Sequence, residues 1–211
     1  MRPHFQNPSD PTEPIYADEF LLAVSKPAGL LAVPGRGLDK QDCLSLRVQR
    51  HFSDALIVHR LDMATSGLLL FARGIPMQRK LSEMFRERLI AKRYTAIVSG
   101  KMDPERGEIT LPISDDWPNR PRQKIDEQGK PALTRFEVME QDGNMARLWL
   151  EPVTGRTHQL RVHLMAINHP IVGDALYGGM HASRLMLHAQ SLEFLHPVSK
   201  ELMRLESEPP F

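Results

Sequence analysis

The sequence predicts an α+β fold, in which short and mostly antiparallel strands form a mixed sheet and a few helices flank it. Three observations lead to this class. Apolar runs of strand length recur along the chain, glycines and prolines separate them, and only three segments have the spacing of an amphipathic helix. With 211 residues and 41% hydrophobic content, the chain can bury one sizeable core. We therefore expect one catalytic domain over residues 15–211.

The first segment is predicted to be a flexible arm. Residues 1–14 hold four prolines and no apolar run, which also excludes a secretory signal peptide. No stretch of the chain approaches the roughly 20 apolar residues that span a bilayer. The single cysteine, Cys43, cannot form an intramolecular disulfide. We expect a soluble, cytoplasmic protein with no membrane partner.

The next elements are predicted to be a hairpin and a helix. The apolar runs Phe20–Val24 and Leu30–Val33 flank a turn rich in proline and glycine, which is typical of two paired strands. Lys26 lies in this turn and Arg36 in the turn PGRG that follows, and both are candidate contacts for an anionic partner. Apolar residues then recur four positions apart over Asp42–Phe52, which predicts a helix capped by its first residue.

The stretch VHRLDMATSGLLLFAR, residues 58–73, is the most informative part of the chain. Its apolar ends read as core strands, and Arg60 and Asp62 lie on the connection between them. Ionised side chains are rarely buried without partners, because removing a charge from water is costly. Two interpretations remain open from these residues alone, an ion pair that holds the loop and a site that uses the carboxylate.

A basic region follows. Between Arg73 and Arg93 there are seven basic and two acidic residues, although the formal net charge of the chain is only +1. Such a region could follow a phosphate backbone or form a solvated helix face. The spacing predicts a helix over Pro76–Leu89 and a strand over Lys92–Gly100, with Tyr94, Ala96 and Val98 on one face.

The segment after the strand Ile109–Ile113 predicts an exposed loop over residues 115–126, DDWPNRPRQKID. Its prolines disfavour both a helix and a central strand. Trp117 offers a surface on which a base could stack. Three cations alternate and would share a direction in an extended chain, and they are Arg120, Arg122 and Lys124.

The last third of the chain predicts a hairpin, a helix and two strands. The hairpin joins Leu133–Met139 to Ala146–Leu150, and the final strands are Leu185–Leu195 and Met203–Leu205. The helix runs from His158 to about Ile167, with Thr157 as its N-cap. Two of its histidines, at positions 158 and 163, lie about 140° apart around the helix, which argues against a metal site.

The motif HRLD followed by TSGLLLFA resembles the signature of the RluA family of RNA pseudouridine synthases, and KPAGLLAVPG, GRTHQLRVHL and LMLHA are similar to its other segments. The resemblance implies the pseudouridine synthase fold with a central active-site cleft. It also implies five roles. Asp62 is the catalytic residue, Arg60 enters the RNA stack in place of the flipped nucleotide, Tyr94 packs on the target base, Arg161 pairs with the catalytic carboxylate, and Leu187 lines the uracil pocket.

The predicted function is isomerisation of uridine to pseudouridine in folded RNA, without cofactor or metal. The DWPNRP loop is similar to family members that modify a 23S rRNA hairpin loop and a tRNA anticodon loop. No S4-type domain is recognisable, so we expect the catalytic domain itself to hold the RNA. We also expect a monomer, with no DNA partner. The expected contacts are Trp117, Arg120, Arg122, Lys124, Lys130, Arg156 and His158.

Three alternatives stay open. The first is a family member that acts on another tRNA or rRNA uridine. The second is a non-catalytic RNA-binding module. The third is a glycoside hydrolase, which would need a second carboxylate across the scissile bond. Only Asp62 lies in a recognisable site motif, so the hydrolase ranks last.

Overall fold

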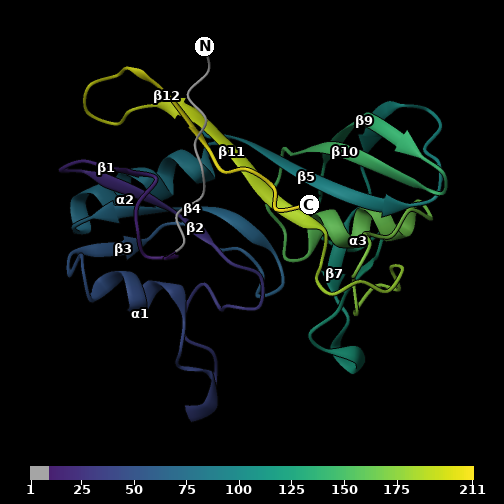
Figure 1. The fold of residues 1–211 in the computed structure, drawn as a ribbon, viewed down its shortest axis with the longest axis horizontal. Coiled ribbons are helices and arrows are strands. Elements are labelled where there is room, and N and C mark those ends of the chain that lie inside the picture. The colour runs from purple at the N-terminus through teal and green to yellow at the C-terminus, as the bar shows by residue number, and fades with distance from the viewer. Residues whose placement is uncertain (1–9) are drawn as a thin grey trace. The chain divides into compact units, whose positions relative to one another are not determined.

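The computed structural model describes residues 10–211, without the side chain of Asp39. These residues divide into two compact units (Figure 1). Unit 1 contains residues 10–91 and 189–210, and unit 2 contains residues 92–188 together with Phe211. Residues 1–9 of the predicted arm lie outside the described residues, so the arm and the single catalytic domain stay predictions. Among the described residues, no helix is long and apolar enough to cross a membrane.

Unit 1 is built around β4 (Ser66–Arg73). Seven of its eight residues are buried, as expected for a strand covered on both faces. Its neighbours in the sheet are β2 (Leu21–Lys26) on one side and β11 (Leu187–Leu195) on the other. The remaining elements of this unit are β1 (Tyr16–Ala17), η1 (Leu38–Lys40), α1 (Leu44–Gln49), β3 (Ala55–Ile57), α2 (Ile75–Arg86) and β12 (Leu202–Glu206).

The core of unit 1 forms where α2 meets this sheet. Met77 and Leu81 of α2 pack with Leu68 and Leu70 of β4. Each fully buried side chain of this size contributes about 2 kcal/mol of hydrophobic free energy. The helix ends three residues before the predicted Leu89, because Arg88 has a positive φ of 61°.

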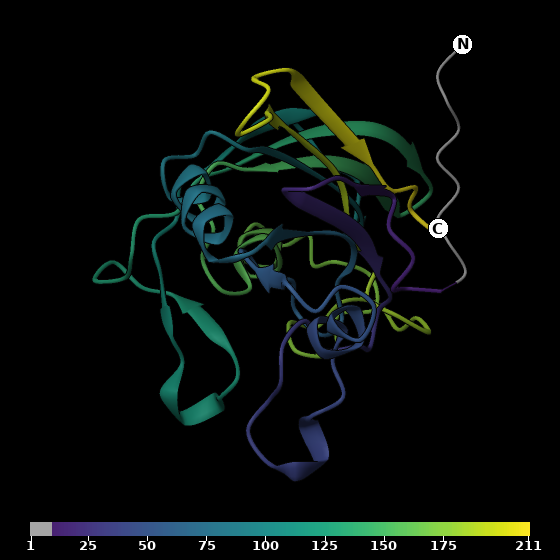
Figure 2. The ribbon, with the colours of Figure 1, turned by 90° about the vertical axis from the view of Figure 1, so that its left-hand side faces the viewer.

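Unit 2 contains four antiparallel strands in the order β5, β10, β9, β6 and a separate two-stranded hairpin, β7 with β8. The hairpin extends away from the other strands of its unit in both views (Figures 1 and 2). The elements are β5 (Ala91–Ser99), β6 (Arg106–Ile109), β7 (Ile113–Asp115), η2 (Trp117–Asn119), β8 (Gln123–Ile125), β9 (Thr134–Asp142), β10 (Met145–Pro152) and α3 (Gln159–Ala166).

The predicted α+β class is confirmed, and so are most strands. The prediction that residues 20–33 form a hairpin is wrong. β2 pairs with β1 and β4 instead, and the second run forms only an isolated bridge between Leu31 and Cys43. The run Ile109–Ile113 divides between β6 and β7, since Leu111 and Pro112 are not in a strand. Asp42 does not cap α1, because it pairs with Arg47 at 2.6 Å.

Candidate active site

Asp62 lies on the connection between two paired strands. β3 and β4 are antiparallel, with Ala55 opposite Arg73, and residues 58–65 form the loop that joins them. Asp62 is half-buried, while Arg60 two positions before it is exposed. The loop therefore carries a carboxylate and a cation from the core of unit 1 toward solvent, as the motif predicts.

One side of this loop is held by a buried lysine. Lys26 is fully buried, and its ammonium group donates three hydrogen bonds. The acceptors are the carbonyl oxygens of Pro27 at 2.8 Å, Leu30 at 2.7 Å and Met63 at 3.1 Å. The backbone N–H of Gly29 also donates to Met63. A buried ammonium needs such acceptors. The prediction that Lys26 contacts an anionic partner is therefore wrong, because its ammonium group is buried.

The other side of the loop is held by a histidine. His59 Nε2 accepts a hydrogen bond from the backbone N–H of Leu70 at 2.9 Å, and its ring stacks on Phe85 with centroids 4.4 Å apart. Within the loop, the N–H of Thr65 donates to the carbonyl oxygen of Asp62 at 3.1 Å. Contacts therefore fix the backbone before and after the carboxylate.

The glycine of the TSG segment has a structural reason. Gly67 has a φ of +112°, and a Cβ built there would lie 2.3 Å from the carbonyl oxygen of Ala189 in β11. A side chain at this position would overlap the backbone of the neighbouring strand. The close approach of β4 and β11 therefore requires glycine at the second position of β4.

In unit 2, the predicted site residue Arg161 is held by an aspartate. Arg161 Nε lies 2.7 Å from Asp174 Oδ2, and Nη2 donates to Oδ1 at 2.8 Å. Both side chains are almost fully buried. Two parallel hydrogen bonds between opposite charges fix the plane of a guanidinium as well as its position. Arg161 thus enters any reaction in a preset orientation.

Tyr94 lies on the face of the unit 2 sheet that α3 covers. Register places Tyr94 opposite Leu150, and Leu150 opposite Phe136, so these side chains share a face. Thr134 lies two residues before Phe136 on this face, and its hydroxyl group is 2.9 Å from His163 of α3. The predicted strand face is confirmed, and it brings Tyr94 to the same side as α3.

His163 is a buried, structural histidine. Its Nε2 lies 2.8 Å from the carbonyl oxygen of Leu111, so Nε2 carries the proton and Nδ1 accepts from Thr134. Burial lowers the pKa of His163 below its ordinary value. Over residues 10–211, no group of three or more His, Cys, Asp or Glu side chains is arranged to hold a metal ion.

The start of α3 differs from the prediction. The residue before the helix is His158, with a φ of 53°, so Thr157 lies outside the helix and is not its cap. His158 Nδ1 lies 2.8 Å from the hydroxyl oxygen of Tyr177. The N–H of Arg156 donates to Gln159 Oε1, and its Nε donates to the carbonyl oxygen of Pro131. These contacts hold both predicted RNA contacts, Arg156 and His158, against unit 2.

The loop of residues 115–126 is a folded hairpin. Trp117 at its tip is 64% exposed, and the guanidinium carbon of Arg120 lies 3.2 Å from the centre of the Trp117 ring. Arg122 lies 5.5 Å from the ring of Tyr177, and Lys124 pairs with Asp126 at 3.1 Å. The three cations do not share one direction, because the chain turns at 120–122 and each cation has a different partner.

The remaining predicted residues are divided between surface and core. Lys130 is exposed and Leu187 is 3% exposed. The basic region is partly neutralised, since Arg73 pairs with Asp54 at 3.1 Å and Arg86 pairs with Glu83 at 3.0 Å. It is therefore a weaker candidate for phosphate contact than its charge count indicates.

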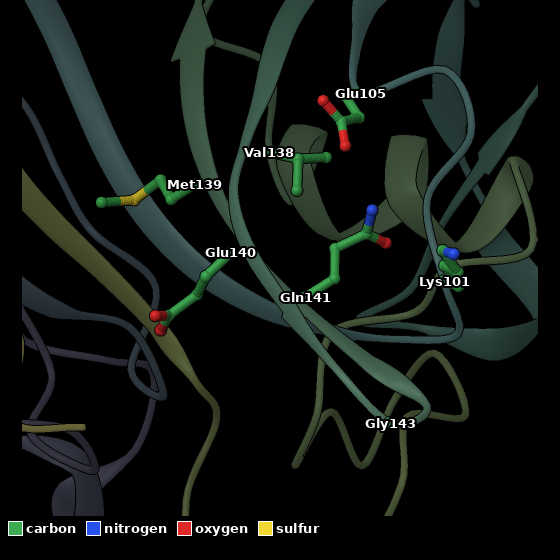
Figure 3. A pocket seen from close by; sticks show the side chains of 7 residues that line it. All are labelled: Lys101, Glu105, Val138, Met139, Glu140, Gln141 and Gly143. Carbon is green, nitrogen blue, oxygen red and sulfur yellow. The ribbon is translucent and has the colours of Figure 1, made fainter.

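A surface pocket of about 440 Å³ lies elsewhere in unit 2 (Figure 3). Its charged side chains include Lys101 and Glu105. The amide of Gln141 is used internally, because Oε1 accepts from the N–H of Met102 and Nε2 donates to the carbonyl oxygen of the same residue. The pocket contains none of the predicted site residues, so we do not assign the reaction to it.

Sequence reasoning missed four residues that support the site. Asp174 and Tyr177 come shortly after the segment that carries Arg161. The polar residues of GDALY, residues 173–177, were the signal that could have identified them. His59 stands directly before Arg60 in the recognised motif. The structural role of Lys26 had no local signal, because its acceptor on Met63 lies 37 residues away.

Comparison with known proteins connects this geometry to chemistry. A family model described as RNA pseudouridylate synthase matches residues 20–166. The chain is 46% identical over 207 residues to the dual-specificity RNA pseudouridine synthase RluA of Vibrio cholerae, covering 95% of this chain and 84% of that protein. It is 44% identical over 216 residues to the protein of the same name from Escherichia coli strain K12, covering 98% and 99%.

Solved structures have the same fold. Human RNA pseudouridylate synthase domain containing 1 aligns with a TM-score of 0.77 and 30% identity, over 93% of this chain and 82% of that one. Human RNA pseudouridylate synthase domain containing 4 aligns with a TM-score of 0.79 and 23% identity, over 93% and 88%. The second likeness concerns the fold alone.

Proposed function

This chain belongs to the RNA pseudouridylate synthase family and isomerises uridine in RNA, and from that premise we propose that Asp62 is the carboxylate that carries out the reaction. The observation that supports this assignment is the double anchoring of its loop. Lys26 holds the carbonyl oxygen of Met63, and His59 binds the backbone of β4. Catalysis favours a reactive group whose position is set before substrate binds.

The reaction rearranges one nucleotide. The C1′–N1 bond breaks, the uracil turns, and C5 bonds to C1′, while C5 loses a proton and N1 gains one. All heavy atoms of the product come from the substrate, and the proton lost from C5 passes to solvent, so a carboxylate with a base-positioning group suffices. Asp62 can serve as nucleophile at C1′, as nucleophile at C6 or as the base that removes the 2′ hydrogen. Each role requires the ionised carboxylate.

Arg60, Tyr94 and Leu187 are proposed to contact the target nucleotide. A base inside a helix or loop must leave its stack, which costs a few kcal/mol. Arg60 is exposed two positions before Asp62, so its planar guanidinium can fill the vacated position. Tyr94 is half-buried and offers a ring to the uracil, and Leu187 offers an apolar wall.

The role of Arg161 as the charge partner of the catalytic carboxylate stays a prediction. Its bidentate pair with Asp174 supports a group that is kept in one orientation. A cation near a carboxylate favours the ionised form. That effect is the one the resemblance implies for this arginine.

We propose that the β7–β8 hairpin is the main RNA contact of unit 2. The Trp117 ring and the Arg120 guanidinium form one exposed stack, which combines a surface for a base with a charge for a phosphate. The exposed residues Arg122, Lys124 and Lys130 lie in or after the same hairpin. Arg156 and His158 are held by internal contacts, so their RNA contact stays a prediction.

We propose a 23S rRNA hairpin-loop uridine and a tRNA anticodon-loop uridine as substrates. The relatives with 44% and 46% identity are named dual-specificity RNA pseudouridine synthases. Both proposed targets are uridines in loops, where the cost of base flipping is lowest. We further propose that the protein acts as a monomer in the cytoplasm, which sedimentation equilibrium and cell fractionation would test.

The test is tritium release from RNA that contains 5-³H-uridine. The substrates are an anticodon stem-loop and a 23S rRNA hairpin, with wild type and the Asp62→Asn variant. We expect release from both RNAs by wild type and none by the variant, because an amide cannot replace the carboxylate in any of its three roles. RNA binding by the variant should stay near that of wild type.

Each contrary outcome identifies a different error. Residual release by Asp62→Asn would remove Asp62 from the reaction. Release from one RNA alone would remove the dual specificity and keep the mechanism. Binding of both RNAs by wild type without release would favour a non-catalytic RNA-binding protein.

A further inference from the structure

Tyr177 lies at the meeting point of three parts of unit 2. It is 4% exposed, and its side chain packs with Ile113 of β7 and Val162 of α3. Its hydroxyl oxygen accepts a hydrogen bond from the backbone N–H of Gln123 in β8 at 2.8 Å. His158, directly before α3, lies 2.8 Å from the same oxygen through Nδ1. One hydroxyl group therefore joins the β7–β8 hairpin to the start of α3.

The ring of Tyr177 also contacts two cations. The guanidinium carbon of Arg161 lies 5.1 Å from the ring centre, and that of Arg122 lies 5.5 Å from it. Both distances are within the range of a cation–π interaction, which is strongest where water is excluded. The ring thus contacts the predicted site arginine of α3 and a cation in the turn of the hairpin, directly before β8.

The backbone of Tyr177 adds a second connection to Arg161. The N–H groups of Tyr177 and Leu176 donate to Asp174 Oδ1 at 3.2 and 3.0 Å. Asp174 is the partner that binds Arg161 through two hydrogen bonds. The orientation of the Arg161 guanidinium therefore depends on the Tyr177 segment through the ring and through the carboxylate.

The hairpin itself needs such an attachment. β7 and β8 have three residues each and pair with each other, and Ile113 at the open end of the hairpin also forms an isolated bridge with Lys130. An isolated two-stranded hairpin is marginally stable in water. The Trp117–Arg120 stack lies at its far end, beyond the Gln123 bond to Tyr177. Gln123 pairs with Asp115 in the last strand pair before the turn, so the position of the stack depends on contacts made next to that turn.

We propose that Tyr177 is a positioning residue that holds the RNA-contacting hairpin in a fixed relation to Arg161. Its hydroxyl group orders the hairpin, and its ring and backbone orient Arg161. This inference rests on the proposed function for its kinetic consequences. When the hairpin is already ordered, binding of RNA costs less conformational entropy than when the hairpin must become ordered on binding.

Two substitutions separate the hydroxyl from the ring. Tyr177→Phe removes the hydrogen bonds of the hydroxyl and keeps the ring, so KM for the anticodon stem-loop should rise about fivefold while kcat stays within about twofold. Tyr177→Leu also removes the ring, so kcat should fall about tenfold in addition. Tyr16→Phe is the matched control. It removes a hydroxyl that donates to Asp18 in unit 1, and both constants should stay unchanged.

A direct measurement of the hairpin distinguishes positioning from general stability. In Tyr177→Phe, amide hydrogen exchange should accelerate at Gln123 and across residues 113–125, while β9 and β10 keep their protection. An unchanged KM, or faster exchange spread evenly over unit 2, would overturn the proposal. So would an equal change in KM for Tyr16→Phe.

The proposal can fail independently of the proposed function. The affinity of the anticodon stem-loop is therefore also measured in the Asp62→Asn background, where no turnover occurs. The inference requires about fivefold weaker binding on adding Tyr177→Phe. Absence of tritium release by wild type would refute the proposed function, whereas unchanged affinity and exchange would refute the role of Tyr177.

Discussion

A buried ammonium group holds the loop around Asp62 in place. Lys26 has three carbonyl acceptors, and one of them belongs to Met63, the residue directly after Asp62. Because all three acceptors are backbone atoms, the lysine orders two segments of chain at once. Its removal would leave carbonyl groups in the core without this donor, and each such group costs about 1–3 kcal/mol.

We expect Lys26→Met to lower the free energy of unfolding by about 3 kcal/mol and to reduce tritium release more than RNA affinity. Urea denaturation and the release assay measure the two effects. Lys80→Met is the matched control, because Lys80 donates to a single carbonyl, that of Pro197 at 2.6 Å. Equal effects of both substitutions would contradict the special role of Lys26.

His163 makes stability depend on pH. Its pKa is lowered by burial from an ordinary value of 6.5, so the unfolded chain binds the proton more readily than the folded one. The free energy of unfolding should therefore fall as pH decreases below about 6.5, by at most about 1.4 kcal/mol per pH unit from this group, until the folded histidine also titrates.

Urea unfolding of wild type and His163→Gln between pH 7 and pH 5 isolates this contribution as the difference between the two slopes. An NMR titration of the His163 ring gives the same information without a substitution. A ring that protonates at or above pH 6.5 in the folded protein would contradict the prediction.

At the scale of elements, the contact between β4 and β11 depends on glycine. Gly67→Ala would place a methyl group 2.3 Å from the carbonyl oxygen of Ala189, so we expect a loss of about 3 kcal/mol or more in the free energy of unfolding. Gly143→Ala is the control. Gly143 also has a positive φ, of 56°, but nothing lies within 4 Å of the added Cβ, so the expected loss is about 1 kcal/mol.

The midpoints of urea denaturation measure both variants. Gly67→Ala reports overlap together with backbone strain, whereas Gly143→Ala reports backbone strain alone. Similar midpoints would show that the approach of β11 does not constrain Gly67. The loop that carries Asp62 ends directly before β4, so a shift of this strand should also lower the rate of tritium release.

At the scale of the whole molecule, local rather than total charge determines RNA binding. The net charge of +1 gives little long-range attraction for a polyanion. Two cations of residues 73–93 form ion pairs described above, Arg73 with Asp54 and Arg86 with Glu83. The Trp117–Arg120 stack is exposed and presents a cation to solvent.

We expect Arg120→Ala to weaken RNA binding and to reduce the slope of log K against log salt by about 0.7, the value for one phosphate contact with a single strand. Arg86→Ala should leave the slope unchanged. Titrations of the anticodon stem-loop at several salt concentrations measure both. An unchanged slope for Arg120→Ala would remove the hairpin from the phosphate-contacting surface.

Much of the architecture could be predicted because its signals are local. The alternation of Tyr94, Ala96 and Val98 predicted a strand face that the register of β5 and β10 confirms. The run Leu30–Val33 was misinterpreted because a second apolar run after a turn is equally typical of a hairpin and of a loop held by a buried lysine. Local spacing does not distinguish the two, because the deciding acceptor, Met63, is distant in sequence.

The sequence by itself determined most of the strands, the three helices within a few residues, and the position of Asp62 on a connection between core strands. Only the tertiary structure revealed the burial of Lys26, the Arg161–Asp174 pair and the contacts of Tyr177. The physical reason is that periodicity and turn chemistry act between neighbours in the chain. The orientation of a charged side chain depends on partners that folding brings from distant segments.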